Sequence, residues 1–104
     1  MQFDVYPNPS SKMREQYPFV VAIQSNLISG LATRMVVPLA TTKLKIDELP
    51  RRLCPLIVVN ELSLMLVPFE AAPLPKRLLK KKVISAKQHG NEVIAAMDAV
   101  ISGF

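Results

Sequence analysis

Apolar and polar residues alternate at the start of the chain. In Gln2–Tyr6 the side chains of Phe3 and Val5 share one face, and the polar residues, Asp4 among them, share the other. This period of two predicts a β-strand. Pro7–Ser11 then breaks the pattern, because proline cannot donate to a strand ladder and Asn and Ser favour turns.

The next two apolar runs predict further strands. Tyr17–Gln24 is rich in Val, Ile and Phe and indicates a buried strand, and Arg34–Leu39 indicates a third. Asn26–Thr33 lies between them, contains a Ser-Gly pair and predicts a loop that is unusually apolar. Thr41–Leu53 is less regular, and its Asp-Glu-Leu-Pro sequence allows one short turn.

The strongest local signal is a β-hairpin. Leu56–Val59 and Leu62–Val67 are separated only by Asn60 and Glu61, and asparagine tolerates the left-handed backbone that a tight turn needs. The second arm is apolar on both faces, which indicates a central or interface strand. Ala71–Pro75 predicts one more short strand, at an edge of the sheet because of its prolines.

The last stretch of the sequence predicts a helix. Ser85 and Gln88 have capping-box spacing near its start, and Asn91 is the alternative cap because Gly90 weakens the first turns by about 1 kcal/mol. Gly103 suits the residue just past the helix end. One apolar stripe follows helical spacing and comprises Val93, Ile94, Met97, Val100 and Ile101. We expect this stripe to pack on the core in all but its last turn.

These elements define a fold class. Five or six short strands are followed by one helix, which predicts a small, mainly β, antiparallel fold with one C-terminal α-helix. A chain of 104 residues is expected to form a single domain over residues 1–104.

Composition adds an expectation about assembly. Half of the residues are hydrophobic, and Trp is absent, so the core is aliphatic. A small domain has a large surface for its volume, and burying this much apolar area inside one copy is difficult. This favours a homodimer, or a partner that covers an apolar patch. The single cysteine fits a reducing cytosol, and no signal peptide or membrane span is expected.

The net charge of +5 leaves three explanations open, which are solubility, an acidic protein partner and nucleic acid. The basic run Lys76–Lys82 has no interleaved aromatic residues, so it does not resemble a stacking platform for single strands. A solvated or partner-facing stretch is the better interpretation.

Catalytic and metal-binding patterns are sparse in the sequence. His89 is the only histidine and is expected to be solvated, while Cys54 lies in an apolar setting and is expected to be a buried hydrophobe. Asp47 and Glu48 are neighbours on a turn, an arrangement that does not make a general acid/base pair. No metal site, cofactor or catalytic residue is predicted, which favours a binding protein over an enzyme.

Several segments, taken in order, resemble one family. The opening Met1–Tyr6, the run Val20–Ile28 and the segment Arg34–Leu39 are similar to motifs of the CcdB toxins of bacterial toxin–antitoxin modules. Leu53–Ile57 and Ala71–Leu74 are similar to two later motifs, and the final helix with its Gly-hydrophobic ending also matches. The resemblance covers nearly the whole chain.

The resemblance implies a fold and an activity. The fold would be a small barrel-like antiparallel sheet with a C-terminal helix, of the CcdB/MazF type, assembled as a homodimer. The activity would be that of a cytoplasmic toxin that binds the A subunit of DNA gyrase and traps the cleaved-DNA complex. The CcdA antitoxin would neutralise it through an acidic, disordered segment, and operator DNA would be bound only by the toxin–antitoxin complex, which represses its own transcription.

The resemblance also implies the gyrase-binding residues. They are Leu27, Ile28, Asp98, Ile101, Ser102, Gly103 and Phe104. The best-known members carry tryptophan where this chain has Ser102 and a final isoleucine where it has Phe104. In an alternative, Ile101 and Phe104 simply pack on the chain's own sheet.

Two other functions stay open at this stage. An endoribonuclease toxin of the MazF/Kid type shares the general fold and would use Arg34 or the Lys76–Lys82 run near RNA. A non-toxic CcdB-like protein that only binds antitoxin is suggested by Ser102.

Overall fold

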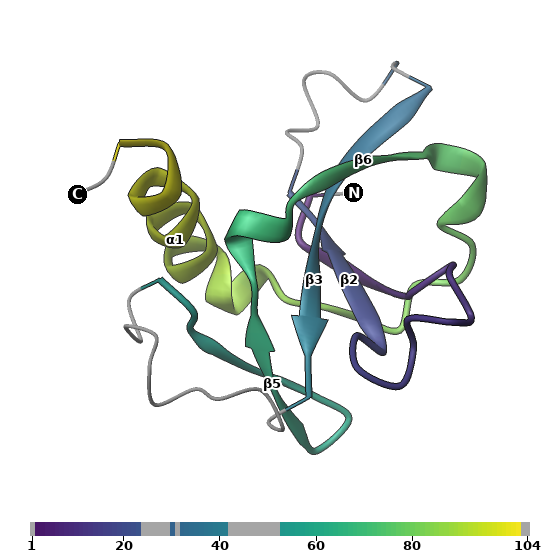
Figure 1. Ribbon diagram of the computed structural model, residues 1–104, viewed down its shortest axis with the longest axis horizontal. Helices are drawn as coiled ribbons and strands as arrows, with labels where there is room; N and C mark the ends of the chain where they lie inside the picture. Colours follow the sequence, from purple (N-terminus) through teal and green to yellow (C-terminus); the bar gives the residue numbers. More distant parts are fainter. Residues whose placement is uncertain (1, 24–29, 31, 42–52, 103–104) are drawn as a thin grey trace.

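The structure is a computed structural model that describes residues 2–23, 30, 32–41 and 53–102 (Figure 1). Most of the predicted loop Asn26–Thr33 and of the irregular stretch Thr41–Leu53 lies outside the described residues.

The described residues form one sheet of seven strands that curls into a nearly closed antiparallel barrel. The strands are β1 (Asp4–Pro7), β2 (Phe19–Ala22), β3 (Thr33–Ala40), β4 (Leu56–Val59), β5 (Leu62–Leu66), β6 (Ala72–Pro75) and β7 (Ile84–Ser85). Their order is β4-β5-β3-β2-β1-β7, with β6 paired to β3. The helix α1 (Gly90–Ser102) follows the last strand (Figure 1). The predicted mainly β fold with a C-terminal helix is confirmed.

Strand β3 connects the two halves of the sheet. One side pairs with β2, while the other side pairs first with β6 and then with β5. Pro38 occupies the point where the partner changes, between Val36 opposite Ala72 and Leu39 opposite Leu66. Its missing N–H therefore interrupts no ladder, and its carbonyl accepts a hydrogen bond from the Val67 N–H at 3.0 Å.

The predicted hairpin is confirmed in register. Val59 faces Leu62 across a two-residue turn, in which Asn60 and Glu61 both have positive φ, 49° and 68°. This backbone belongs to a type I′ turn, whose twist matches that of the strands. Strand β5 lies between β4 and β3 and is therefore central, as its apolar faces predict.

The two faces of β5 contact two separate hydrophobic clusters. Leu64 and Leu66 join the main core under α1, whereas Met65 joins a smaller cluster with Cys54 and Val67. The main core also contains Phe3, Val5, Val21, Val37, Leu39, Ile57, Val59, Ala86, Val93 and Ala96. The predicted burial of Cys54 is confirmed, since this side chain is 2% exposed.

The edges of the sheet are short. Strand β6 pairs only with β3 among the described residues, so the predicted edge position is confirmed. Strand β7 has two residues and pairs with β1, with Asp4 opposite Ser85 and Val5 opposite Ile84. The prediction of Ser85 as a helix cap is therefore wrong, because Ser85 belongs to the sheet.

The helix begins five residues later than Ser85, after a short 3-10 turn, η5 (Lys87–His89). Gly90 is its first residue and is buried against Phe3. A Cβ at Gly90 would lie 2.8 Å from Cε2 of Phe3. This close approach explains why a glycine occupies the position, which the sequence pattern identified only as a residue that weakens the helix.

The first strand differs from its prediction in extent. Phe3 has a φ of 67° and precedes the strand, so β1 runs from Asp4 to Pro7 rather than over residues 2–6. Asp4 is 5% exposed, and its carboxylate lies 3.9 Å from the Lys82 ammonium.

Candidate functional site

The face of α1 that packs on the sheet differs from the predicted stripe. Val93 and Ala96 are 1% and 0% exposed, and Met97 packs against the same core. Ile94 is 49% exposed and Ile101 is 78% exposed. The prediction that Ile94 packs on the core is therefore wrong, and the buried face centres on the side of Val93 and Ala96.

A small residue explains this rotation. The side chain of Ala96 is short, so the helix can approach the core closely along the line from Val93 to Ala96. The helix also contacts the 3-10 turn η3 (Pro68–Glu70), whose Pro68 is buried. A sequence pattern that counts only large apolar residues therefore places the centre of the helix–core contact too near Ile94.

The exposed face of α1 combines two apolar side chains with one carboxylate. Ile94, Asp98 and Ile101 have i, i+4, i+7 spacing, so they share one face, and all three are exposed. Among the described residues the Asp98 carboxylate has no hydrogen-bond or ion-pair partner. Negative charge toward the carboxyl end of a helix is unfavourable by a few tenths of a kcal/mol, roughly, so this position does not serve the stability of α1.

Ser102 is turned back onto its own helix. Its Oγ donates a hydrogen bond of 2.6 Å to the carbonyl oxygen of Asp98. The serine therefore adds little contact area to the exposed face, in contrast to a large aromatic side chain at the same position.

The structure brings together only part of the predicted site. Asp98, Ile101 and Ser102 lie together on the last turns of α1, whereas Leu27, Ile28, Gly103 and Phe104 lie outside the described residues. The alternative in which Ile101 packs on its own sheet is wrong, because this side chain is the most exposed of the large apolar residues described. The sequence pattern placed Ile94 in the buried stripe, and the signal against this was the alanine at position 96.

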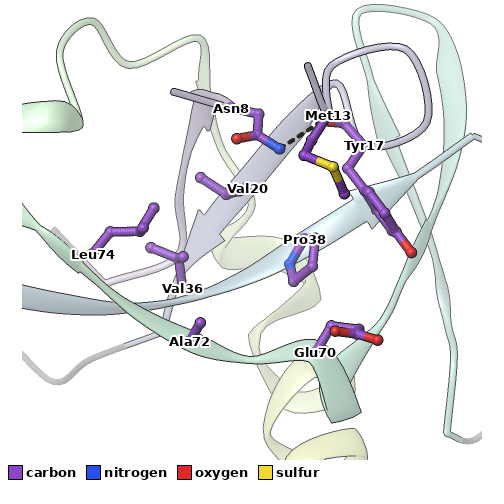
Figure 2. Close-up of a pocket in the computed structure, with 9 residues that line it drawn as sticks. All are labelled: Asn8, Met13, Tyr17, Val20, Val36, Pro38, Glu70, Ala72 and Leu74. Atoms are coloured by element: carbon purple, nitrogen blue, oxygen red, sulfur yellow. Dashed lines mark hydrogen bonds between the residues drawn. The ribbon is translucent and has the colours of Figure 1, made fainter. Parts of the chain in front are cut away.

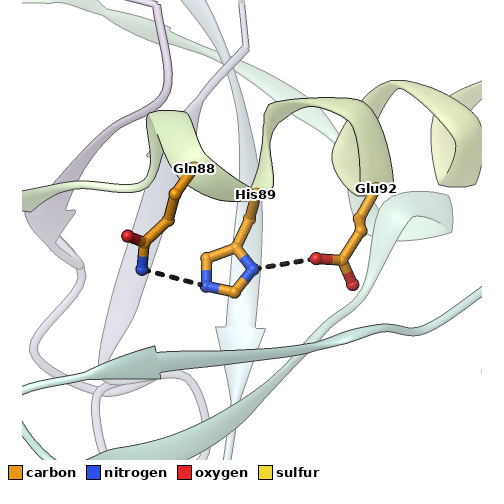
Figure 3. Close-up of polar contacts among 3 residues, drawn as sticks. All are labelled: Gln88, His89 and Glu92. Carbon is orange, nitrogen blue, oxygen red and sulfur yellow. Dashed lines mark hydrogen bonds and ion pairs between the residues drawn. The ribbon is translucent and has the colours of Figure 1, made fainter.

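His89 is more constrained than predicted. Its Nδ1 lies 2.9 Å from Oε1 of Glu92, and its Nε2 lies 3.5 Å from Nε2 of Gln88 (Figure 3). The side chain is 20% exposed, so this histidine is partly rather than fully in contact with solvent. The contact with Glu92, in the first turn of α1, ties the 3-10 turn to the helix.

The basic residues considered for RNA binding differ in their exposure. Arg34 is 8% exposed, and its Nη1 donates a hydrogen bond of 2.9 Å to the carbonyl oxygen of the preceding residue, Thr33. Burial and the charge of Asp4 raise the pKa of Tyr6, while Arg34 acts in the opposite direction. In the basic run, Lys76, Arg77 and Lys80–Lys82 are exposed.

Neither a metal cluster nor a spanning helix is found in the described parts of the chain. No group of three or more His, Cys, Asp or Glu side chains comes together there. None of the helices there is long and apolar enough to cross a membrane.

Comparison with known protein families identifies a match over nearly the whole chain. The family model described as CcdB protein matches residues 2–103, which is nearly the whole chain.

Proposed function

This chain belongs to the CcdB protein family, whose members are toxins of toxin–antitoxin modules, and from this premise we propose that it binds the A subunit of DNA gyrase and traps the cleaved-DNA complex. The action is by binding, without catalysis. The end of α1 forms the contact surface, with Asp98, Ile101 and Ser102 among the described residues. Leu27, Ile28, Gly103 and Phe104 complete the proposed surface.

The exposure of Ile101 carries this proposal. An isoleucine that is 78% exposed on an ordered helix gains nothing for the fold, since it stays in water. On a partner it is a candidate anchor, because a few apolar side chains at the centre of an interface supply most of the binding energy. Asp98, one turn away, offers a carboxylate that a basic residue of the partner can pair.

The assembly belongs to the same proposal. A homodimer would place two copies of this helix end in one gyrase-binding surface. The CcdA antitoxin is the second proposed partner, and the net charge of +5 suits an acidic, disordered segment. Operator DNA is bound only by the complex of toxin and antitoxin.

The ribonuclease alternative is supported less well. Arg34, one of the two basic candidates, is 8% exposed and bonded to its own strand, so it is poorly placed for RNA. The exposed residues of the Lys76–Lys82 run remain as the basic surface, and the carboxylate beside Lys82, that of Asp4 at 3.9 Å, belongs to a residue that is only 5% exposed.

A gyrase cleavage assay tests the proposal. Purified chain is mixed with gyrase and supercoiled DNA, and the accumulation of cleaved DNA is measured for wild type, Ile101→Ser and Leu62→Ser. Leu62 is the matched control, since it is also an exposed leucine-sized residue, at 54%, but lies in the β4–β5 hairpin. We expect wild type and Leu62→Ser to trap cleaved DNA alike, and Ile101→Ser to need about tenfold more protein.

The other outcomes separate the alternatives. Wild-type protein that leaves gyrase untouched would refute the proposal. RNA cleaved by the same preparation would establish the ribonuclease alternative. Tight antitoxin binding with neither activity would establish the non-toxic one.

A further inference from the structure

The outer face of the sheet carries a groove that none of the features above uses. It has a cavity volume of about 200 Å³ and lies between strands β2, β3 and β6 and the segment that connects β1 to β2 (Figure 2). Val20 and Val36 form its floor, and Leu74 closes one end. The contact surface proposed on α1 shares no residue with this groove.

The polar groups of the groove lie at the other end. Figure 2 shows the Tyr17 hydroxyl and the Glu70 carboxylate on the side away from Leu74. Within the described parts of the chain, neither group has a hydrogen-bond or ion-pair partner. The remaining polar side chain, Asn8, is already occupied, because its Nδ2 donates to the Tyr17 carbonyl oxygen and its Oδ1 accepts from the Ser10 N–H, both at 2.9 Å.

The described lining of the groove carries one charged side chain, that of Glu70. Among the described residues, Glu70 is the only carboxylate that lines the groove, in a chain whose net charge is +5. Arg14 is not among the lining residues, but it is held beside one of them, because its Nε donates to the Asn8 carbonyl oxygen at 2.6 Å. Met13, which is 45% exposed, lies at the rim and can adapt to an occupant because its side chain is unbranched.

We propose that this groove binds a small amphiphilic amine, with an aromatic or branched apolar body over Val20 and Val36 and its ammonium group at Glu70 and Tyr17. The volume suits this class, since a closed apolar cavity of roughly 150 Å³ is enough for one benzene ring. The ammonium donates to the carboxylate and the phenol oxygen, the two groups that have open acceptor capacity. The proposal is independent of gyrase binding.

Three probes of nearly equal shape test the charge requirement. We titrate 15N-labelled protein with 2-phenylethylamine, 2-phenylethanol and phenylacetate at low salt and follow the backbone amides of Asn8, Val20 and Val36 by NMR. For a ligand of this size in an open groove we expect a Kd on the order of 1 mM for the amine. The amine should bind about threefold more tightly than the alcohol, and phenylacetate most weakly.

Two variants and one control locate the effect. In Glu70→Gln the amine should lose its threefold advantage over the alcohol, whereas Glu61→Gln, which removes the same charge from the β4–β5 turn, should keep it. Ala72→Leu fills the groove from an exposed position on an edge strand and should abolish binding of all three probes. If Ala72→Leu disturbs the sheet, Glu70→Gln still decides the question.

Three results would overturn the proposal. They are the absence of saturable shifts at the groove, a preference for phenylacetate over the amine, and an amine preference that survives in Glu70→Gln. A preference for phenylacetate would assign the dominant charge to Arg14.

Discussion

Gly90 shows how one residue can set the start of a helix. Its backbone has ordinary helical angles, with φ of −54° and ψ of −43°, so it needs no glycine for conformational reasons. What it lacks is space, because the Phe3 ring occupies the position where a Cβ would lie. Phe3 is itself 8% exposed and packed in the main core, so it cannot move away freely.

In Gly90→Ala, two effects on stability therefore oppose each other. Alanine favours helix by about 1 kcal/mol over glycine, while overpacking a core contact costs about 1–3 kcal/mol. We expect the variant to be less stable than wild type by about 1 kcal/mol in urea unfolding. Asn91→Ala, at the next and exposed position, is the control and should be neutral or stabilising. A Gly90→Ala protein more stable than wild type would show that the Phe3 ring yields at no cost.

Cys54 gives a pH dependence with a definite sign. Burial raises the pKa of its thiol above the ordinary value of 9.0, so the unfolded chain loses this proton at lower pH than the folded one. The contribution to stability is full below the unfolded pKa and is lost as pH rises toward the folded pKa. We expect the free energy of unfolding to fall above pH 9, with a smaller slope in Cys54→Ala. Urea midpoints between pH 7 and 10 measure this; equal slopes in both proteins would contradict it.

At the scale of elements, the two turn residues determine the geometry of the β4–β5 hairpin. Asn60 and Glu61 both adopt the left-handed backbone, which asparagine tolerates and glutamate does not favour. The strands on either side supply the energy that holds Glu61 there, through the pairing of Val59 with Leu62 and of Ile57 with Leu64.

Glu61→Gly should relieve this strain. We expect the variant to be more stable by about 1 kcal/mol, because glycine adopts positive φ freely and Asn-Gly is the preferred sequence of a type I′ turn. Asn60→Gly is the control and should gain less. Thermal or urea unfolding measures both, and a loss of stability in Glu61→Gly would mean that the Glu61 side chain contributes to the fold.

Elements with local signals could be predicted from the sequence, and elements fixed by distant contacts could not. The β4–β5 hairpin and strand β3 follow from apolar patterns and turn residues within a few positions. Strand β7 has only two residues and exists through its pairing with β1, about eighty positions earlier. The helix start depends on Phe3 in the same way, and the exposed face of α1 depends on how closely Ala96 lies to the core.

At the scale of the whole molecule, the proposed gyrase surface is a small set of exposed groups at one end of α1. Of the predicted set, Asp98, Ile101 and Ser102 could be placed together from their helical spacing alone. The exposure of these side chains could not be predicted from the sequence, since the same spacing is equally compatible with packing on the sheet. Ile94 joins the exposed face only because the helix is rotated.

Ser102→Trp tests the size of this surface. The resemblance to CcdB toxins implies a tryptophan here, and a buried interface tryptophan contributes about 2 kcal/mol or more. We expect Ser102→Trp to trap cleaved DNA at a concentration about tenfold lower than wild type. Asn91→Trp, exposed at the other end of α1, is the control and should have no effect. An unchanged gyrase response in Ser102→Trp would place this position outside the contact.

The pairing of β1 with β7 also has a consequence for synthesis on the ribosome. Strand β1 leaves the ribosome about eighty residues before one of its two neighbours, β7, and before the helix that covers the core. Until Ile84–Ser85 and α1 have left the exit tunnel, the apolar side chains of Val5, Val21 and Val37 lack part of their cover. The nascent chain therefore cannot close its barrel while only the earlier strands have been translated, and the core stays partly open to other apolar surfaces during that interval.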